Sequence, residues 1–102
     1  MDIRPIAPGH TLVIPKVEID RFFDLESDVL AKYLPFSKPI AAAIEQVVPC
    51  ERVGLMVAGL EVPHAHLHLV PIRTINDLSF ANATPADQNS LADLATKIRA
   101  CL

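Results

Sequence analysis

Cysteine is scarce in this chain, and its scarcity excludes two kinds of small fold. The 102 residues include only two cysteines, Cys50 and Cys101, which are far apart and form no C-x-x-C pair. Neither a zinc knuckle nor a disulfide scaffold is therefore indicated. We expect two buried free thiols in a reducing compartment.

Positive charge and long apolar runs are also lacking. Nine basic against 12 acidic residues give a formal net charge of −3, which excludes a surface able to coat a nucleic-acid polymer but allows a local pocket for one phosphate. No apolar run approaches membrane-spanning length, and the first residues have no signal-type apolar core. We therefore expect a cytoplasmic protein that binds a nucleotide rather than a membrane or a nucleic-acid polymer.

Apolar residues, in contrast, are abundant. They make up 51% of the chain while charged residues make up 21%, and the mean hydropathy is +0.33. A chain of this length is expected to form a single domain, residues 1–102, with a high surface-to-volume ratio. So many apolar side chains on so small a domain predict a buried subunit interface.

The spacing of apolar residues predicts strands and helices without repeats or linkers. Expected strands cover 10–15, 52–58 and 62–73, and the last two are neighbours in a hairpin. Expected helices cover 21–33, interrupted at Pro35, and 39–48, which is apolar enough to be buried or at an interface. A third helix is expected to start at 84–87 with Thr84 as its cap. This order predicts an α+β fold with a mainly antiparallel sheet.

Three of the four histidines alternate within residues 62–70, VPHAHLHLV. Side chains alternate between the two faces of a strand, so His64, His66 and His68 are expected to share one face. The intervening apolar residues would then pack on the other face. Because unpartnered buried imidazoles are costly, such an array indicates a functional site.

Metal binding is one explanation of this array. With a rise of about 3.3 Å per residue, His64 and His68 are roughly 13 Å apart along a strand, whereas zinc requires each nitrogen at about 2.0–2.1 Å. Three histidines of one regular strand can hardly share an ion, and the chain has no H-E-x-x-H motif. A histidine-based metal-binding protein remains an alternative, and we expect no metal.

Nucleophilic attack on phosphorus suits the array better. A neutral imidazole can attack a phosphate ester while neighbouring imidazoles donate hydrogen bonds to its oxygens. His66 has a neighbouring histidine on each side. Attack through one ring nitrogen requires that the other keep its proton, held by an acceptor such as a main-chain carbonyl.

Two blocks of the sequence resemble the histidine triad (HIT) superfamily of nucleotide hydrolases and transferases. Residues 64–70, HAHLHLV, match its His-x-His-x-His signature followed by two hydrophobic residues, and residues 2–16, DIRPIAPGHTLVIPK, look like its other recurrent segment. The resemblance implies a HIT-like α+β fold with helices packed on one face of the sheet. It also implies action at the α-phosphate of phosphoramidates or dinucleoside polyphosphates, without a cofactor, by a protein that is often a homodimer.

The resemblance also assigns roles to individual residues. It makes His66 the nucleophile of a nucleotidyl-histidine intermediate, oriented by the main-chain carbonyl of His64. His68 would contact the α-phosphate, and His10 would lie near the phosphate or the leaving group. At the ribose and base end of the pocket, the matching positions are Asp2 and Ile3.

The chain departs from the family pattern in two places. It starts just before Asp2, without the helix and two strands that usually enclose the base, so we expect a fold truncated at its N-terminus. Its loop before the histidines is short, and Glu61 occupies the nucleotide-binding place of a Ser or Thr. An ionised carboxylate there repels phosphate unless it pairs with an imidazolium. A nucleotide-binding module with little or no turnover is therefore an alternative function.

Overall fold

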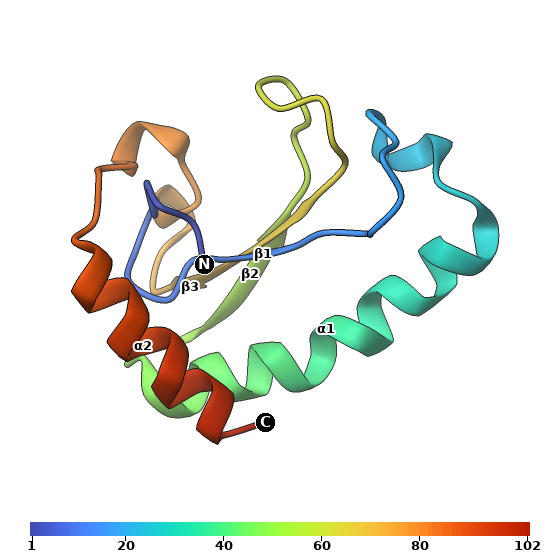
Figure 1. The fold of residues 1–102 in the computed structure, drawn as a ribbon. Helices are drawn as coiled ribbons and strands as arrows, with labels where there is room; N and C mark the ends of the chain where they lie inside the picture. Colours follow the sequence, from blue (N-terminus) through green and yellow to red (C-terminus); the bar gives the residue numbers. More distant parts are fainter.

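A three-stranded antiparallel sheet and two helices form the core of the computed structural model, which describes residues 1–102 (Figure 1). The strands are β1 (Thr11–Val13), β2 (Arg52–Met56) and β3 (Leu67–Ile72), in the order β1-β3-β2. Both strand pairs are antiparallel, so the predicted hairpin and the predicted α+β class are confirmed. The helices are α1 (Ser27–Val47) and α2 (Gln88–Ala100), and three short 3₁₀ turns lie in the connections.

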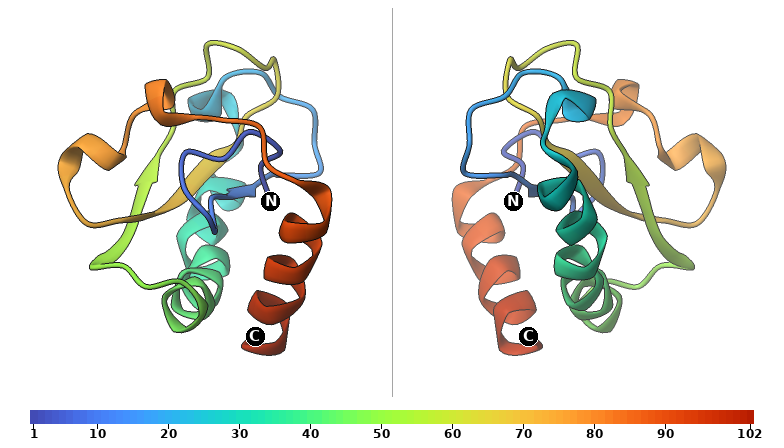
Figure 2. Two further views of the ribbon diagram at one scale, coloured as in Figure 1. Left: turned by 90° about the vertical axis from the view of Figure 1, so that its left-hand side faces the viewer. Right: turned by 90° about the vertical axis from the view of Figure 1, so that its right-hand side faces the viewer.

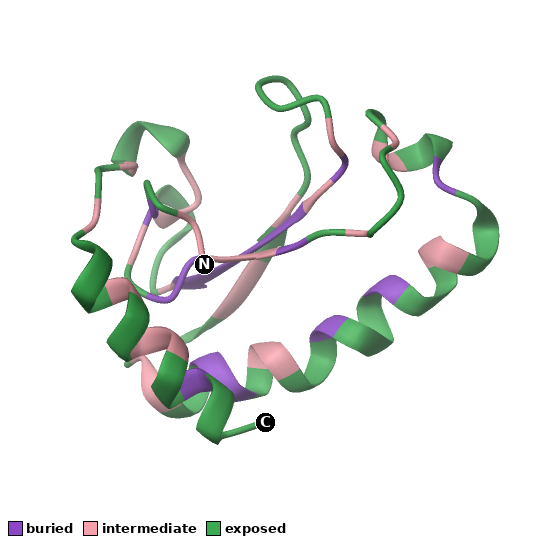
Figure 3. Ribbon diagram, in the orientation of Figure 1, coloured by how far each residue is buried: buried purple, intermediate pink, exposed green.

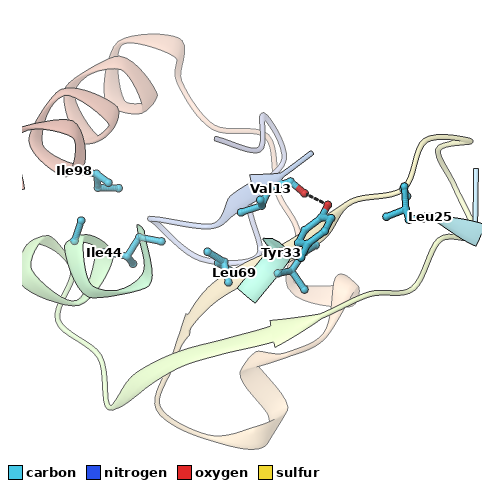
Figure 4. Packing of buried hydrophobic residues seen from close by; sticks show 9 residues of the cluster. Val13, Leu25, Tyr33, Ile44, Leu69 and Ile98 are labelled. Atoms are coloured by element: carbon cyan, nitrogen blue, oxygen red, sulfur yellow. Dashed lines mark hydrogen bonds between the residues drawn. The ribbon is translucent and has the colours of Figure 1, made fainter. Parts of the chain in front are cut away.

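One face of the central strand β3 packs into the apolar core, and the opposite face carries His68. Leu67 and Leu69 belong to the cluster of buried residues that includes Ile44 of α1, and the labelled members of this cluster are drawn in Figure 4. His68 lies between these leucines, so its side chain points to the opposite face. Burial is concentrated along β3 and on the side of α1 that faces it (Figure 3).

Helix α1 is one continuous helix where two were expected. Pro35 and Pro39 lie inside it, four residues apart on an exposed face, whereas Tyr33 and Ser37 point into the protein. The amide donors that the prolines lack are thus missing on the solvent side, where water can bond the freed carbonyl groups. Packing of the buried face maintains the helix through both prolines.

Helix α2 starts later than expected. Thr84 does not cap it; Asp87 does, because its carboxylate accepts a hydrogen bond from the amide of Ser90. The residues before Asp87 are extended: the amides of Thr84 and Ala86 donate to the carbonyls of Pro5 and Ile3. From Gln88 onward α2 packs against α1, and the two helices lie side by side (Figure 2).

Three further expectations can be compared with the structure. Strand β3 begins only at Leu67, so His64 and His66 lie in the connection before it. The apolar stretch 40–48 was expected to be buried or at an interface, and its Ala43 and Ile44 are buried in the core, in agreement with the first alternative. The expectation of two buried thiols is wrong, because Cys101 is exposed and Cys50 is only half-buried. Neither helix has the length and hydropathy needed to cross a bilayer.

Candidate active site

A cavity of about 410 Å³ lies on the face of the sheet opposite α1. It is enclosed by the N-terminal segment, the β2–β3 connection (residues 57–66) and the segment after β3. The residues that line it are Asp2, Ile3, Arg4, Leu12, Ala58, Gly59, Leu60, Glu61, Val62, His66, His68, Phe80 and Ala83. A larger cavity, of about 520 Å³, lies beside Cys50 and Arg73 and has no histidine in its lining. The chemistry-bearing residues therefore mark the smaller cavity as the candidate site.

The ring of His66 is oriented by a nearby main-chain carbonyl. Its Nδ1 lies 2.7 Å from the carbonyl oxygen of His64. A carbonyl only accepts hydrogen bonds, so Nδ1 carries the proton and Nε2 carries the lone pair. This tautomer is the one that a nucleophilic imidazole in the cavity requires.

A chain of hydrogen bonds fixes the tautomers of His10 and His68. The amide of Ile6 donates to Nδ1 of His10 at 3.0 Å, so the proton of the neutral His10 ring is on Nε2. That Nε2 lies 2.8 Å from Nδ1 of His68, to which it donates. His68 must then carry its own proton on Nε2. The ring that lines the cavity therefore presents an N–H donor.

Burial keeps these two rings neutral. Desolvation, with smaller contributions from His10 and His66, lowers the pKa of His68 from 6.5 to about 4. Desolvation also lowers the pKa of His10, an effect that the carboxylate of Asp2 partly offsets. At neutral pH both rings are uncharged, as the hydrogen-bond chain requires.

The first histidine of the array is directed elsewhere. Nε2 of His64 donates to the carbonyl of Pro15 at 2.9 Å, and His64 is not among the residues that line the cavity. The rings of His66 and His68, by contrast, are neighbours with centroids 4.7 Å apart. The expectation that all three imidazoles share one face of a strand is therefore wrong, because β3 is too short to contain them. His64 contributes its carbonyl to the site.

Gly9 allows His10 to enter the interior. Its φ is +96°, and a Cβ at this position would lie 2.9 Å from Cγ2 of Val48 and 3.0 Å from Cγ of Pro71. Only glycine adopts this conformation readily at so close an approach. The turn places His10, which is completely buried, 58 residues away in sequence from its partner His68.

The remaining expected residues border the same cavity. Asp2 and Glu61 lie on different segments of its wall, and the side chain of Ile3 is 70% exposed. Sequence reasoning missed Arg4, Leu12 and Phe80 as lining residues. Phe80 packs against His68 in an edge-to-face arrangement, with ring centroids 5.1 Å apart. Its only signal in the sequence is a single aromatic residue in a loop.

A metal ion fits this site poorly. Asp2, His10 and His68 each have a ligand-type atom within 4.8 Å of the others. However, Nδ1 of His10 already accepts a hydrogen bond from Ile6, and its Nε2 proton occupies the lone pair on Nδ1 of His68. Imidazole binds a metal through a free lone pair. The two histidines use these lone pairs for each other and for the backbone.

Comparison with known proteins gives a consistent result. The family model described as HIT domain matches residues 1–75. The chain is 34% identical over 74 residues to adenosine 5′-monophosphoramidase of Saccharomyces cerevisiae, covering 72% of this chain and 47% of that protein. It is 29% identical over 98 residues to the asymmetrical bis(5′-nucleosyl)-tetraphosphatase of Schizosaccharomyces pombe, covering 87% and 54%. The chain thus spans about half the length of the curated relatives it matches.

Solved structures share the fold. A Hit-like protein of Bartonella henselae superposes with a TM-score of 0.82 at 31% identity, over 100% of this chain and 77% of that one. A hypothetical histidine triad nucleotide-binding protein of Sulfolobus tokodaii superposes with a TM-score of 0.84 at 25% identity, over 99% and 74%. The arrangement of sheet and helices therefore recurs in these proteins.

Proposed function

The chain belongs to the HIT domain family, and from the geometry of its histidine pocket we propose that it is a hydrolase or transferase acting on the α-phosphate of nucleoside 5′-phosphate derivatives. Relatives named as a monophosphoramidase and a bis(5′-nucleosyl)-tetraphosphatase support this class of reaction. The observation that carries the proposal is the bond from Nδ1 of His66 to the carbonyl of His64. It leaves the Nε2 lone pair of a cavity-lining ring free to attack.

The reaction proceeds in two displacements. Nε2 of His66 forms a bond to the α-phosphorus, and the bond to the leaving atom breaks with its electron pair on that atom. An amine leaving group takes a proton from water. Water then attacks the same phosphorus, the bond to Nε2 breaks, its pair returns to the ring, and the proton of the water goes to solvent. One proton is taken up and one is released.

Neighbouring residues bind and orient the substrate. His68 donates its Nε2 proton to a non-bridging oxygen, where negative charge develops in the transition state. His10 keeps His68 in the donating tautomer. The carboxylate of Asp2 accepts hydrogen bonds from ribose hydroxyls, and Ile3 contacts the base. No step in this scheme uses a cofactor.

The experiment that tests the proposal looks for the covalent intermediate. The protein is mixed with a nucleoside 5′-phosphoramidate and quenched within seconds, and intact mass spectrometry is used to detect a nucleotidyl adduct. We expect an adduct in the wild type and none in His66→Ala, whose hydrolysis rate should fall at least about a thousandfold. A melting curve of the variant shows whether it is folded. An undiminished rate in folded His66→Ala would contradict the proposal.

A nucleotide-binding module with little turnover is the second candidate function. Two observations favour it: the open position of Ile3 at the rim of the cavity, and the presence of Glu61 in its wall. Calorimetry with a nucleoside monophosphate distinguishes the candidates. Binding without product at high enzyme concentration supports the module.

We also propose that two copies of the chain associate through β2. This strand is at the edge of the sheet, so one row of its backbone groups is unpaired. Its Leu55 is 56% exposed, and Val57, just beyond the strand, is exposed as well. Pairing of two β2 strands would cover these side chains and join the two sheets.

A further inference from the structure

Glu61 is a carboxylate in the candidate site without a partner of its own. It lies in the connection between β2 and β3, it is exposed, and it lines the cavity together with His66 and His68. No basic nitrogen lies within 4.0 Å of its carboxylate; the single contact of this kind in the structure is between Nε2 of the neutral His10 and the carboxylate of Asp2, at 3.8 Å. Its charge is therefore available to a ligand.

The cavity as a whole carries more negative than positive charge. Its charged lining residues are Asp2, Glu61 and Arg4, that is, two carboxylates and one guanidinium. His68 adds no positive charge, because burial lowers its pKa to about 4. A polyphosphate leaving group would bring several negative charges into this surrounding. An amine leaving group would bring none.

The two carboxylates belong to different walls. Asp2 comes from the N-terminal segment, where its Oδ1 also accepts a hydrogen bond from the backbone amide of Arg4. Glu61 comes from the β2–β3 connection, five residues before the nucleophile His66. The proposed function assigns Asp2 to the ribose. Glu61 is therefore the carboxylate of the cavity that is available to contact the leaving group.

We propose that Glu61 is a specificity residue that selects nucleoside 5′-phosphoramidates whose leaving alkylamine carries a second, positively charged amino group. This inference rests on the proposed function and narrows its substrate class. The carboxylate of Glu61 pairs with the distant ammonium, while the nitrogen bonded to phosphorus is displaced by His66. Glu61 takes no part in bond making, and the leaving nitrogen receives its proton from water as above.

The selection acts mainly on substrate binding. The ammonium is present both before and during the displacement, so its pairing with Glu61 stabilises both states similarly and lowers KM more than it raises kcat. An ion pair at an exposed carboxylate is worth about a fivefold preference at low salt. Salt should weaken that preference.

Three substrates with the same nucleoside 5′-phosphoryl group test this inference. In one the leaving group is 1,4-diaminobutane, in the second it is butylamine, and in the third it is pyrophosphate. We expect wild-type kcat/KM to be about fivefold higher for the diamine than for butylamine, mostly through KM, and lowest for pyrophosphate. In Glu61→Gln the ratio of diamine to butylamine should fall to about one. Glu61→Lys should shift preference towards pyrophosphate.

A matched control is Glu51→Gln, which removes an exposed carboxylate just before the start of β2, outside the cavity lining. It should keep the wild-type ratio. Equal wild-type kcat/KM for the two amines, or an unchanged ratio in Glu61→Gln, overturns the role of Glu61. If the butylamine substrate is nevertheless hydrolysed with formation of an adduct, the proposed function is upheld. Absence of an adduct with all three substrates overturns both.

Discussion

Nε2 of His10 donates its proton to Nδ1 of His68 across 2.8 Å, and the amide of Ile6 decides the direction of this bond. A main-chain amide can only donate, so Ile6 donates to His10 and His10 donates to His68. His68 therefore presents its own N–H to the cavity. The buried His10 thereby acts on the site through His68.

The bond between these rings makes His10 a positioning residue. His10→Leu removes the donor to His68 and should lower kcat/KM roughly ten- to a hundredfold, since a lost hydrogen bond to a buried partner costs about 1–3 kcal/mol. His10→Gln keeps a side-chain N–H and should recover part of this loss. Steady-state kinetics of both variants provide the measurement. Equal kcat/KM values of His10→Leu and His10→Gln would argue against a donor role of His10.

The ring of His64 should matter for stability more than for activity. Its Nε2 bonds Pro15, whereas His66 uses only its main-chain carbonyl. His64→Gln should therefore destabilise the fold by about 1 kcal/mol while keeping kcat/KM within about threefold. Urea unfolding and kinetics measure the two effects. A loss of activity as severe as that of His66→Ala would show that the ring itself takes part.

Stability should decrease in mild acid. The unfolded chain protonates His68 near pH 6.5, but the folded chain does so only near pH 4. Between these values the unfolded state holds more protons, so the free energy of unfolding falls as the pH drops through this window, by at most roughly 3 kcal/mol. Melting temperatures from about pH 7.5 to 4.5 measure the effect. His68→Asn should show a smaller slope, and an identical slope would contradict this origin.

Tyr33 links α1 to β1. Its hydroxyl donates to the carbonyl of Val13 at 2.5 Å, and both residues are buried (Figure 4). Tyr33→Phe keeps the ring that packs against Phe22 but removes this buried hydrogen bond, which should cost about 1 kcal/mol. Chemical denaturation measures this cost. Activity at low temperature should be retained, because the hydroxyl does not border the cavity.

The exposed edge of β2 should govern association. If two chains pair through it, light scattering will give twice the chain mass of 11.1 kDa. Leu55→Lys places a charge on this edge and should produce monomers that keep the wild-type secondary structure. A wild-type protein of single-chain mass at all accessible concentrations would exclude the proposed dimer.

The β2–β3 hairpin could be predicted from sequence because its information is local. A short apolar run identifies the first strand, and alternation identifies the second but places its start too early, because β3 begins only at Leu67. The contact between His10 and His68 is different, since it joins residues 58 positions apart. No periodicity describes such a contact, and only the resemblance to a family indicated that His10 belongs to the site.

The two helix errors have tertiary causes. Proline predicts the end of a helix from local geometry, but the buried Tyr33 and Ser37 hold α1 together across Pro35. Thr84 and Pro85 are good residues for a helix start, yet the amide of Thr84 is bonded to Pro5 instead. In each case a partner distant in sequence outweighs the local preference.

The two amide bonds from Thr84 and Ala86 to the N-terminal segment bear on how the chain can be shortened. The family model ends at residue 75, but Phe80 and Ala83 form part of the cavity wall. A fragment that ends at residue 75 would lose this part of the wall and the two hydrogen bonds to the carbonyls of Ile3 and Pro5. The residues beyond 75 thus complete the wall of the candidate site and hold the N-terminal segment in place.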